Sequence, residues 1–397
     1  NDNYQILNKY TSENNIDLKG FTVLPGFIDA HCHFLEYGLQ KNMVDVSDAQ
    51  SFKEIIELLK LNQNKVANEW LVGYGWDQNK WGDKNWPNNK LLNENFKNIN
   101  VILKRIDGHV IMANQKAIQS LKIPIDTIIS GGYIEKIDDV VTGLFVDKAM
   151  SLILDRLPES DEISKKKAIL KAQSDCLAFG LTTIDIAGLN KKDIDLLEKL
   201  HSTDELKIKV YAMLSNNEEN FKFYIDSIGH PYKTKKLNVR SFKFFADGSL
   251  GSRGACLLKP YSDHENSYGM LLQKKELFEK KLRKIKSAGF QACTHSIGDS
   301  TNRSVLKSYS KILKSSNDLR WRIEHAQCVN NNDLHYFKKF NIIPSVQPTH
   351  ATSDYSWAAN RIGKKRLSNC YRYKTLYEEK MIWLTIFIGV IIYAHFA

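Results

Sequence analysis

The chain is predicted to be an α/β protein that folds as a (β/α)8 TIM-like barrel, on three observations. From about residue 160, segments with helical periodicity alternate with short apolar segments typical of strands. Seven strand candidates occur, and an apolar run near the end of the sequence stands where an eighth is due. No G-x-G-x-x-G motif follows the first strand, which disfavours the alternative fold, an open doubly wound sheet.

The predicted elements follow one another with short connections. A helix at 162–179 ends at Gly180, a residue suited to terminating a helix. Strands are predicted at 22–33, 181–187, 208–215, 239–247, 290–297, 321–327 and 342–348, and the eighth is expected around 382–392. Helices are predicted between them at 191–201, 218–227, 274–288, 301–315 and 331–340.

Residues 34–160 interrupt this alternation and are predicted to be an insertion after the first strand. They contain one amphipathic helix, predicted at 52–67, and then a stretch rich in Gly, Asn and Trp at 73–87. Such long insertions are usually functional, and in a barrel this one would overhang the end that carries the active site. The predicted barrel therefore spans 21–397 and includes the insertion.

Composition limits the classes of function. The formal net charge is +11, but the lysines occur in short clusters such as 165–167 and 233–236, which are typical of solvated surfaces. No nucleic-acid-binding motif accompanies them, so we expect no nucleic-acid partner. The six cysteines are isolated, without a C-x-x-C pair, which favours a reducing compartment and a cytoplasmic protein. The sequence leaves a homodimer open.

The last 17 residues, 381–397, are apolar and carry no formal charge. Three interpretations stay open for this tail: a buried barrel strand with an apolar extension, a membrane anchor, or an out-of-frame end. A membrane partner is expected only if the tail is an anchor.

The strongest chemical signal is the segment PGFIDAHCH, in which His31 and His33 are two residues apart. In a strand this spacing places both side chains on one face. His295 and His325 are also predicted at the ends of strands, and a barrel brings its strand ends together. Neutral imidazoles bind zinc, iron or nickel, so the four histidines predict a site for a divalent metal.

Lys243 stands in a predicted strand, between two phenylalanines that would face the other side. A lysine pointing into a barrel would be costly unless paired. Two interpretations stay open: a lysine carboxylated by CO₂, which would be an anionic metal bridge, or a lysine paired with a carboxylate such as Asp247.

The order of several motifs resembles the N-substituted formamide deformylase-like branch of the amidohydrolase superfamily, amidohydrolase family 3, over nearly the whole chain. The shared motifs, in order, are PGFIDAHCH, GWD (75–77), DGHVIMAN (107–114), TG (142–143), GLTTIDIAG (180–188), KFFADGSLGSRGA, THSIGD and RIEHAQ. The resemblance implies a metal-dependent hydrolase barrel that cleaves a non-peptide carbon–nitrogen bond of a small amide, N-formyl or N-acyl substrate through a metal-activated water.

The resemblance also implies roles for individual residues. His31 and His33 would bind the first of one or two divalent metal ions, expected to be zinc, and His295 and His325 would bind the second. Lys243, carboxylated, would bridge them, and Lys243, His295 and His325 would serve catalysis. Candidate substrate contacts are Asp107, His109, Asp247, Arg253 and Trp76; Trp76 and Trp81 could equally be packing residues.

The chain departs from the family pattern at two places. The family has a small β domain, of which only residues 1–20 resemble a remnant. The family also places an aspartate at the end of the eighth strand, where this sequence reads WLTIFIGVII. A carboxylate there typically contributes about 10²–10⁴-fold to the rate by moving protons. The alternative function is therefore a truncated, catalytically impaired barrel that binds metal, unless Asp299 or Asp354 takes over this role.

Overall fold

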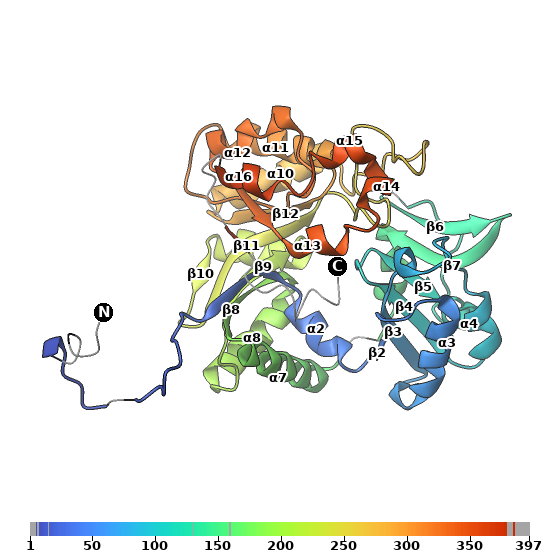
Figure 1. The fold of residues 1–397 in the computed structure, drawn as a ribbon, viewed down its shortest axis with the longest axis horizontal. Coiled ribbons are helices and arrows are strands. Elements are labelled where there is room, and N and C mark those ends of the chain that lie inside the picture. The colour runs from blue at the N-terminus through green and yellow to red at the C-terminus, as the bar shows by residue number, and fades with distance from the viewer. Residues whose placement is uncertain are drawn as a thin grey trace.

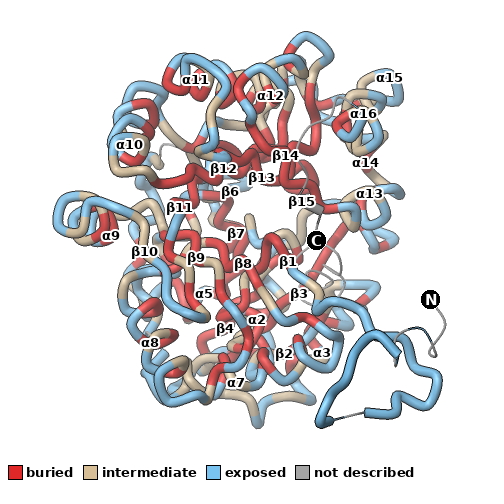
Figure 2. The backbone as a smooth tube through the Cα atoms, turned by 90° about the vertical axis from the view of Figure 1, so that its left-hand side faces the viewer, coloured by how far each residue is buried: buried red, intermediate tan, exposed pale blue. Residues whose placement is uncertain are grey.

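The structure is a computed structural model that describes residues 5, 8–14, 16–129, 131–158, 160–378 and 384–385. These residues form two sheets, which Figure 1 shows as neighbouring units: the barrel, and a second unit formed by the insertion. In Figure 2 the strands of the barrel are buried, while the helices expose their outer faces.

The barrel sheet consists, in spatial order, of β1 (Phe27–Cys32), β8 (Leu181–Leu189), β9 (Lys209–Ser215), β11 (Leu237–Phe245), β12 (Gln291–Ser296), β13 (Arg322–His325), β14 (Ile343–Val346) and β15 (Leu384–Thr385). All neighbours along this path are parallel, in the order of the chain, as successive βα units require. The first seven strands form a nearly closed barrel, which confirms the predicted TIM-like fold. A short strand, β10 (Tyr232–Lys233), pairs antiparallel with β11.

Helices and short helical turns cover the outside of the barrel. They are α2 (Phe34–Gln40), α7 (Glu162–Ala178), α8 (Lys191–Ser202), α9 (Glu218–Asn220), α10 (Lys275–Ser287), α11 (Asp299–Leu313), the 3₁₀ turn η5 (Asn331–Asp333) and α12 (His335–Phe340). The side chain of Asp161 caps the start of α7, and a capping box formed by Asn190 and Asp193 starts α8. Gly180, with φ +77°, turns the chain from α7 into β8 as predicted.

The predicted helix at 218–227 differs from a regular α-helix. Only α9 is α-helical, and Phe221–Ile228 (η4) form a π-helix that ends at Gly229, whose φ is +77°. The other predicted helices and the first seven predicted strands of the barrel are present, with boundaries shifted by a few residues.

The insertion folds into a second, mixed sheet that the sequence analysis missed. Its spatial order is β2 (Val44–Asp45), β3 (Trp70–Trp76), β4 (Asn100–Arg105), β5 (Val110–Ala113), β7 (Val140–Asp147) and β6 (Gly132–Ile137). The pairs β2–β3 and β3–β4 are parallel, and the other three are antiparallel. The predicted helix at 52–67 is shorter, α3 (Phe52–Leu61), followed by the 3₁₀ turn η1 (Gln63–Lys65).

The insertion has cores of its own on the two faces of its sheet. Leu71, Val101 and Leu103 pack with the helix α3, whereas Ile102, Ile111 and Phe145 belong to a separate cluster. The remaining elements of the insertion are η2 (Gln78–Lys80), α4 (Lys90–Asn95), α5 (Gln115–Ser120), η3 (Lys148–Met150) and α6 (Ser151–Leu154). The insertion is thus a small α/β unit.

After β14 the chain returns across the end of the barrel in four short helices, α13 (Thr349–Ser353), α14 (Ala358–Ile362), α15 (Lys364–Leu367) and α16 (Tyr373–Glu378). A disulfide between Cys328 and Cys370 joins this segment to the chain just after β13. This pairing was not predicted, since the cysteines are isolated in the sequence.

Two predictions concern the ends of the chain. The structure assigns no strand to the described residues of 1–20, so the β-domain remnant stays a prediction. Of the predicted eighth strand, only Leu384 and Thr385 are described; the rest of 382–392, and the tail from 386, lie outside the described residues. Among the described helices, none has the length and hydrophobicity needed to cross a bilayer.

Candidate functional site

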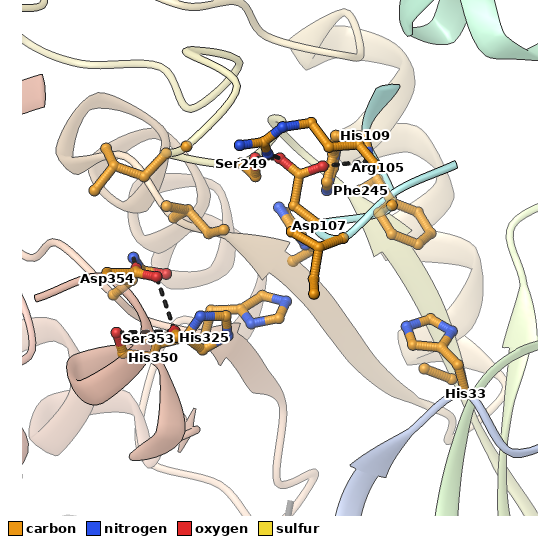
Figure 3. A pocket seen from close by; sticks show the side chains of 18 of the residues that line it. His33, Arg105, Asp107, His109, Phe245, Ser249, His325, His350, Ser353 and Asp354 are labelled. Carbon is orange, nitrogen blue, oxygen red and sulfur yellow. Dashed lines mark hydrogen bonds and ion pairs between the residues drawn. The ribbon is translucent and has the colours of Figure 1, made fainter. Parts of the chain in front are cut away.

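A cavity of about 530 Å³ opens at the carboxyl ends of the barrel strands, within the range of small-molecule sites. Its lining comes from three places. The barrel contributes His33, Lys243, His295 and His325; the insertion contributes Arg105, Asp107 and His109; the segment after β14 contributes His350, Ser353 and Asp354. Figure 3 shows Arg105, Asp107 and His109 as one group, His325, His350 and Asp354 as a second, and His33 apart from both.

The four predicted metal-binding histidines lie in one cluster. The ring centroids of His31 and His33 are 5.8 Å apart, those of His31 and His325 are 5.1 Å apart, and those of His295 and His325 are 4.4 Å apart. His325 has a φ of +73°, an unusual conformation for a residue with a side chain, which is common at functional sites. The barrel therefore brings these strand ends together as the sequence suggests.

Beneath the cavity, His31 is tied into a fully buried charged network. Its Nδ1 lies 2.5 Å from Oε2 of Glu324, and the guanidinium of Arg322 donates to both oxygens of Glu324, at 2.6 and 2.9 Å. Arg322 also donates to Asp185, at 3.0 Å, and to the carbonyl oxygen of Ala30, at 2.6 Å. This network fixes the ring of His31, as carboxylates commonly do for histidine ligands of metals.

Lys243 is almost completely buried, and its Nζ lies 3.1 Å from Nε2 of His31. Burial lowers the pKa of Lys243 to about 8, although Glu324 opposes this shift. A lysine must lose its proton before its amine reacts with CO₂, so this environment favours carboxylation. Pairing with Asp247, the other interpretation, is not observed: the oxygens of Asp247 accept backbone N–H groups of Cys256, Ile297 and Gly298.

Burial also keeps the barrel histidines neutral. It lowers the pKa of His31 to about 4 and holds the pKa values of His33, His295 and His325 well below their usual value. Neutral imidazoles offer lone pairs to a metal, and Nδ1 of His325 is buried without a hydrogen-bond partner among the described residues. The donor chemistry thus fits a divalent metal, although no three His, Cys, Asp or Glu side chains in the described part of the chain are preassembled around one point.

The insertion side of the cavity is built from charged pairs. Arg105 is buried; it donates to Asp77 at 2.7 Å and also pairs with Asp107, which accepts a hydrogen bond from Ser249. Burial raises the pKa of Asp107, but the Arg105 guanidinium lowers it, and the net result is a pKa below the usual value. Because Ser249 lies in the loop after β11, these contacts join the insertion to the barrel.

His109 stands in the same wall and bonds to Asp147, with Nδ1 and Oδ1 2.7 Å apart. Burial alone would lower the pKa of His109, but Asp147, Asp107 and Asp247 together raise it. Its ring centroid lies 5.3 Å from that of His295, so the insertion approaches the barrel histidines directly.

The structure divides the predicted substrate contacts into two sets. Asp107 and His109 line the cavity. Asp247 is fully buried and accepts hydrogen bonds from backbone N–H groups. Arg253 pairs with Asp263 at 3.1 Å. Trp76 stacks against Trp81 in the core of the insertion. These last three are not among the described residues that line the cavity, so the packing interpretation suits Trp76 and Trp81.

Asp299 and Asp354, the two candidates for the missing carboxylate, lie in different environments. Asp299 accepts the backbone N–H of Leu258 and does not line the cavity among the described residues. Asp354 lines the cavity and accepts from Tyr371 at 2.7 Å and from Gln327 at 2.9 Å. Burial raises the pKa of Asp354 to about 6.

Sequence reasoning missed several polar residues of the site: Asp147, Asp185, Arg322, Glu324 and His350. One signal was available, because Asp185, Arg322 and Glu324 are charged residues inside strands that are otherwise apolar. Asp147 and His350 gave no such signal, since their importance depends on contacts between distant segments.

The chain matches known proteins over most of its length. A model of the Amidohydrolase family matches residues 15–385. The putative amidohydrolase YtcJ of Bacillus subtilis is 28% identical over 92% of this chain and 70% of that protein. The N-substituted formamide deformylase of Arthrobacter pascens is 24% identical over 78% of this chain and 60% of that protein.

Among solved structures, an uncharacterized metal-dependent hydrolase from Pyrococcus horikoshii aligns with a TM-score of 0.73 and 30% identity, covering 94% of this chain and 73% of that one. The family match, the barrel and the histidine cluster agree with one another, and the chain belongs to the amidohydrolase family.

Proposed function

We propose that the chain hydrolyses a non-peptide carbon–nitrogen bond of a small N-formyl or N-acyl amide in this cavity. The observation that carries the proposal is the convergence of His31, His33, His295, His325 and Lys243 at the carboxyl ends of the strands, beside a cavity of about 530 Å³. The similarity to a protein named N-substituted formamide deformylase supports the class of bond.

These five residues would hold one or two divalent ions, with zinc as the expected metal and Lys243 as the candidate for carboxylation. A bound divalent metal supplies Lewis acidity, which lowers the pKa of water and polarises a carbonyl group. Glu324 keeps the ring of His31 in place, and burial keeps the imidazoles neutral.

The other walls of the cavity bind and orient the substrate. Asp107 and His109 offer polar atoms on the insertion side, while Leu154, Phe245 and Trp357 offer apolar surface to an acyl or N-substituent. Because the walls come from two units and from the segment after β14, the bound substrate is enclosed and water is partly excluded.

One observation favours the alternative function, a barrel that binds metal without hydrolysis. The stretch WLTIFIGVII contains no aspartate, and both oxygens of Asp354 already accept hydrogen bonds, from Ser353, Gln327 and Tyr371. Asp354 would then be less available to accept a proton from the attacking water.

The deciding experiment measures metal content by elemental analysis and hydrolysis of a panel of small N-formyl and N-acyl amines. Wild type is compared with His31→Ala/His33→Ala and with His230→Ala/His264→Ala, a matched control at two exposed histidines. We expect about one or two metal equivalents and amide hydrolysis in wild type and control, both lost in the first variant. Metal without hydrolysis would favour the alternative, and folded wild type without metal after zinc addition would overturn the site.

A further inference from the structure

In the insertion, the ring of His109 bonds to the carboxylate of Asp147, while its backbone N–H donates to Oδ1 of Asp107 at 3.1 Å. Asp147 accepts from Nδ1 of His109 at 2.7 Å, and its own backbone N–H donates to the carbonyl oxygen of His109 at 2.9 Å. A carboxylate only accepts hydrogen bonds, so Nδ1 carries the proton. The other ring nitrogen, Nε2, has no hydrogen-bond partner among the described residues, and the ring lines the cavity. Nε2 is therefore the atom that His109 presents to a ligand.

The backbone of Asp147 is strained. Its φ of 50° and ψ of −121° lie in a region that glycine adopts readily and that residues with a side chain avoid. The side chain is fully buried, and its Oδ2 has no hydrogen-bond partner among the described residues. Glycine at this position would remove both the strain and the buried oxygen, so stability alone does not explain an aspartate here.

The loop after β11 in the barrel leaves space for the carboxylate of Asp147. A Cβ on Gly248 would lie 2.5 Å from Oδ1 of Asp147, and a Cβ on Gly254 would lie 2.6 Å from Oδ2. Both glycines lie in the loop after β11, which also contains Ser249. Two units of the fold thus accommodate one carboxylate whose visible contact with a side chain is the bond to His109.

We propose that Asp147 is a positioning residue, which orients His109 so that Nε2 forms a hydrogen bond with the amide group of the bound substrate. This inference rests on the proposed function and deepens it, because the insertion then supplies the face of the site opposite the barrel histidines. The ring centroids of His109 and His295 are 5.3 Å apart, so a small amide held at the barrel histidines lies within reach of His109.

The test separates stability from function at one position. In Asp147→Gly the strain disappears, so the unfolding midpoint is expected to stay unchanged or to rise by about 1–3 °C. kcat/KM for the best N-formyl amine is expected to fall about 10- to 100-fold, as when other carboxylates that orient histidines are removed. Asp147→Asn keeps an acceptor oxygen and nearly the same shape, so it should recover part of the loss. His109→Gln should lose at least as much as Asp147→Gly.

Asp139→Gly is the matched control, because Asp139 also has a positive φ, 60°, but is exposed in the turn between β6 and β7. We expect its kcat/KM and metal content to equal those of wild type. A purely structural Asp147 would give the opposite pattern in Asp147→Gly: a lower midpoint and unchanged kcat/KM. That result, or no recovery in Asp147→Asn, would overturn the inference.

A second measurement keeps this inference distinguishable from the proposed function. Calorimetry measures the Kd of the same N-formyl amine in wild type and in each variant. If wild type binds the amide without hydrolysing it, hydrolysis fails as the function. A Kd about tenfold weaker in Asp147→Gly would then still support the role of Asp147 in orienting His109. If wild type hydrolyses the amide and Asp147→Gly retains both Kd and kcat/KM, the proposed role of Asp147 is refuted and the proposed function stands. Wild type that neither binds nor hydrolyses amides overturns both.

Discussion

Histidines on the two sides of the cavity have opposite electrostatic environments. In the barrel, burial lowers the pKa of His31 to about 4 and keeps the pKa values of His295 and His325 well below the usual value. In the insertion, the pKa of His109 is raised despite burial. The neutral form of histidine is thus favoured on the barrel side of the cavity, and the protonated form is favoured by neighbouring carboxylates on the insertion side.

The difference does not follow from the presence of a carboxylate, since His31 also has one. Glu324, 2.5 Å from His31, is shared with Arg322, and Lys243 lies on the other side of the ring. Burial is the largest cause that lowers the pKa of His31, and Lys243 and Arg322 lower it further while Glu324 raises it, whereas His109 faces Asp147 and Asp107, which raise its pKa. Both histidines are buried, so the difference in the direction of their pKa shifts follows from the neighbouring charges.

The largest expected effect comes from removing the cation of the barrel network. Arg322→Met removes the guanidinium from the buried carboxylates of Asp185 and Glu324, and breaking a buried ion pair typically costs about 3–5 kcal/mol. We expect the free energy of unfolding, measured by urea denaturation, to fall by that amount.

Arg320→Met is the matched control, since Arg320 pairs with Asp318 at the exposed surface and such pairs contribute roughly 0–1 kcal/mol. Equal losses in the two variants would show that the barrel network does not carry the stability that we assign to it.

The second prediction tests the contrast between histidines through pH. His109 has a raised folded pKa, so its contribution to stability is fully present below the unfolded pKa of 6.5 and is lost as pH rises through the folded value. His350, whose pKa burial lowers to about 4, behaves oppositely: its contribution is present above 6.5 and is lost as pH falls towards about 4.

The measurement compares the free energy of unfolding of wild type, His109→Gln and His350→Gln across this range. The difference between wild type and His109→Gln should shrink as pH rises, and that between wild type and His350→Gln should shrink as pH falls. If the free energies of unfolding of the two variants changed with pH in the same way, the predicted difference between His109 and His350 would be contradicted.

The barrel could be predicted from the sequence because its strands are continuous apolar runs separated by amphipathic helices. The sheet of the insertion could not. Strand β3 contains Gly73 and Gly75 and ends at Trp76, a composition typical of a loop, and none of the residues of β6 is buried. Their pairing depends on partners elsewhere in the insertion, and local propensity does not reveal it.

The residues of the site likewise fall into those that could be predicted from the sequence and those that could not. The histidines and Lys243 could be found because each stands at or near the end of a predicted strand, and barrel topology alone brings such ends together. Asp147 could not be found, because its role depends on a positive φ and on two glycines about a hundred residues away in the sequence. Asp247 and Arg253 were expected to contact the substrate, and this stays a prediction. Asp247 accepts backbone N–H groups and lies 3.5 Å from Nε2 of His295, and Arg253 pairs with Asp263.

The smallest expected effect tests the contact between the two sides of the cavity. Gly248→Ala adds a methyl group that would lie 2.5 Å from Oδ1 of Asp147, closer than these atoms can approach. The carboxylate must move, and the hydrogen bond to Nδ1 of His109 weakens without the loss of any polar group. We expect kcat/KM for an N-formyl amine to fall several-fold, up to about tenfold, less than in Asp147→Gly.

Gly82→Ala is the control, because a Cβ on Gly82 meets no atom within 4 Å. The combination of Gly248→Ala with Asp147→Gly is informative, because the added methyl group then no longer meets a carboxylate. The double variant should be no slower than Asp147→Gly alone, since both changes act through the same hydrogen bond. Additive losses would mean that Gly248 affects the cavity by another route, and the insertion and the barrel would then be coupled through contacts other than the carboxylate of Asp147.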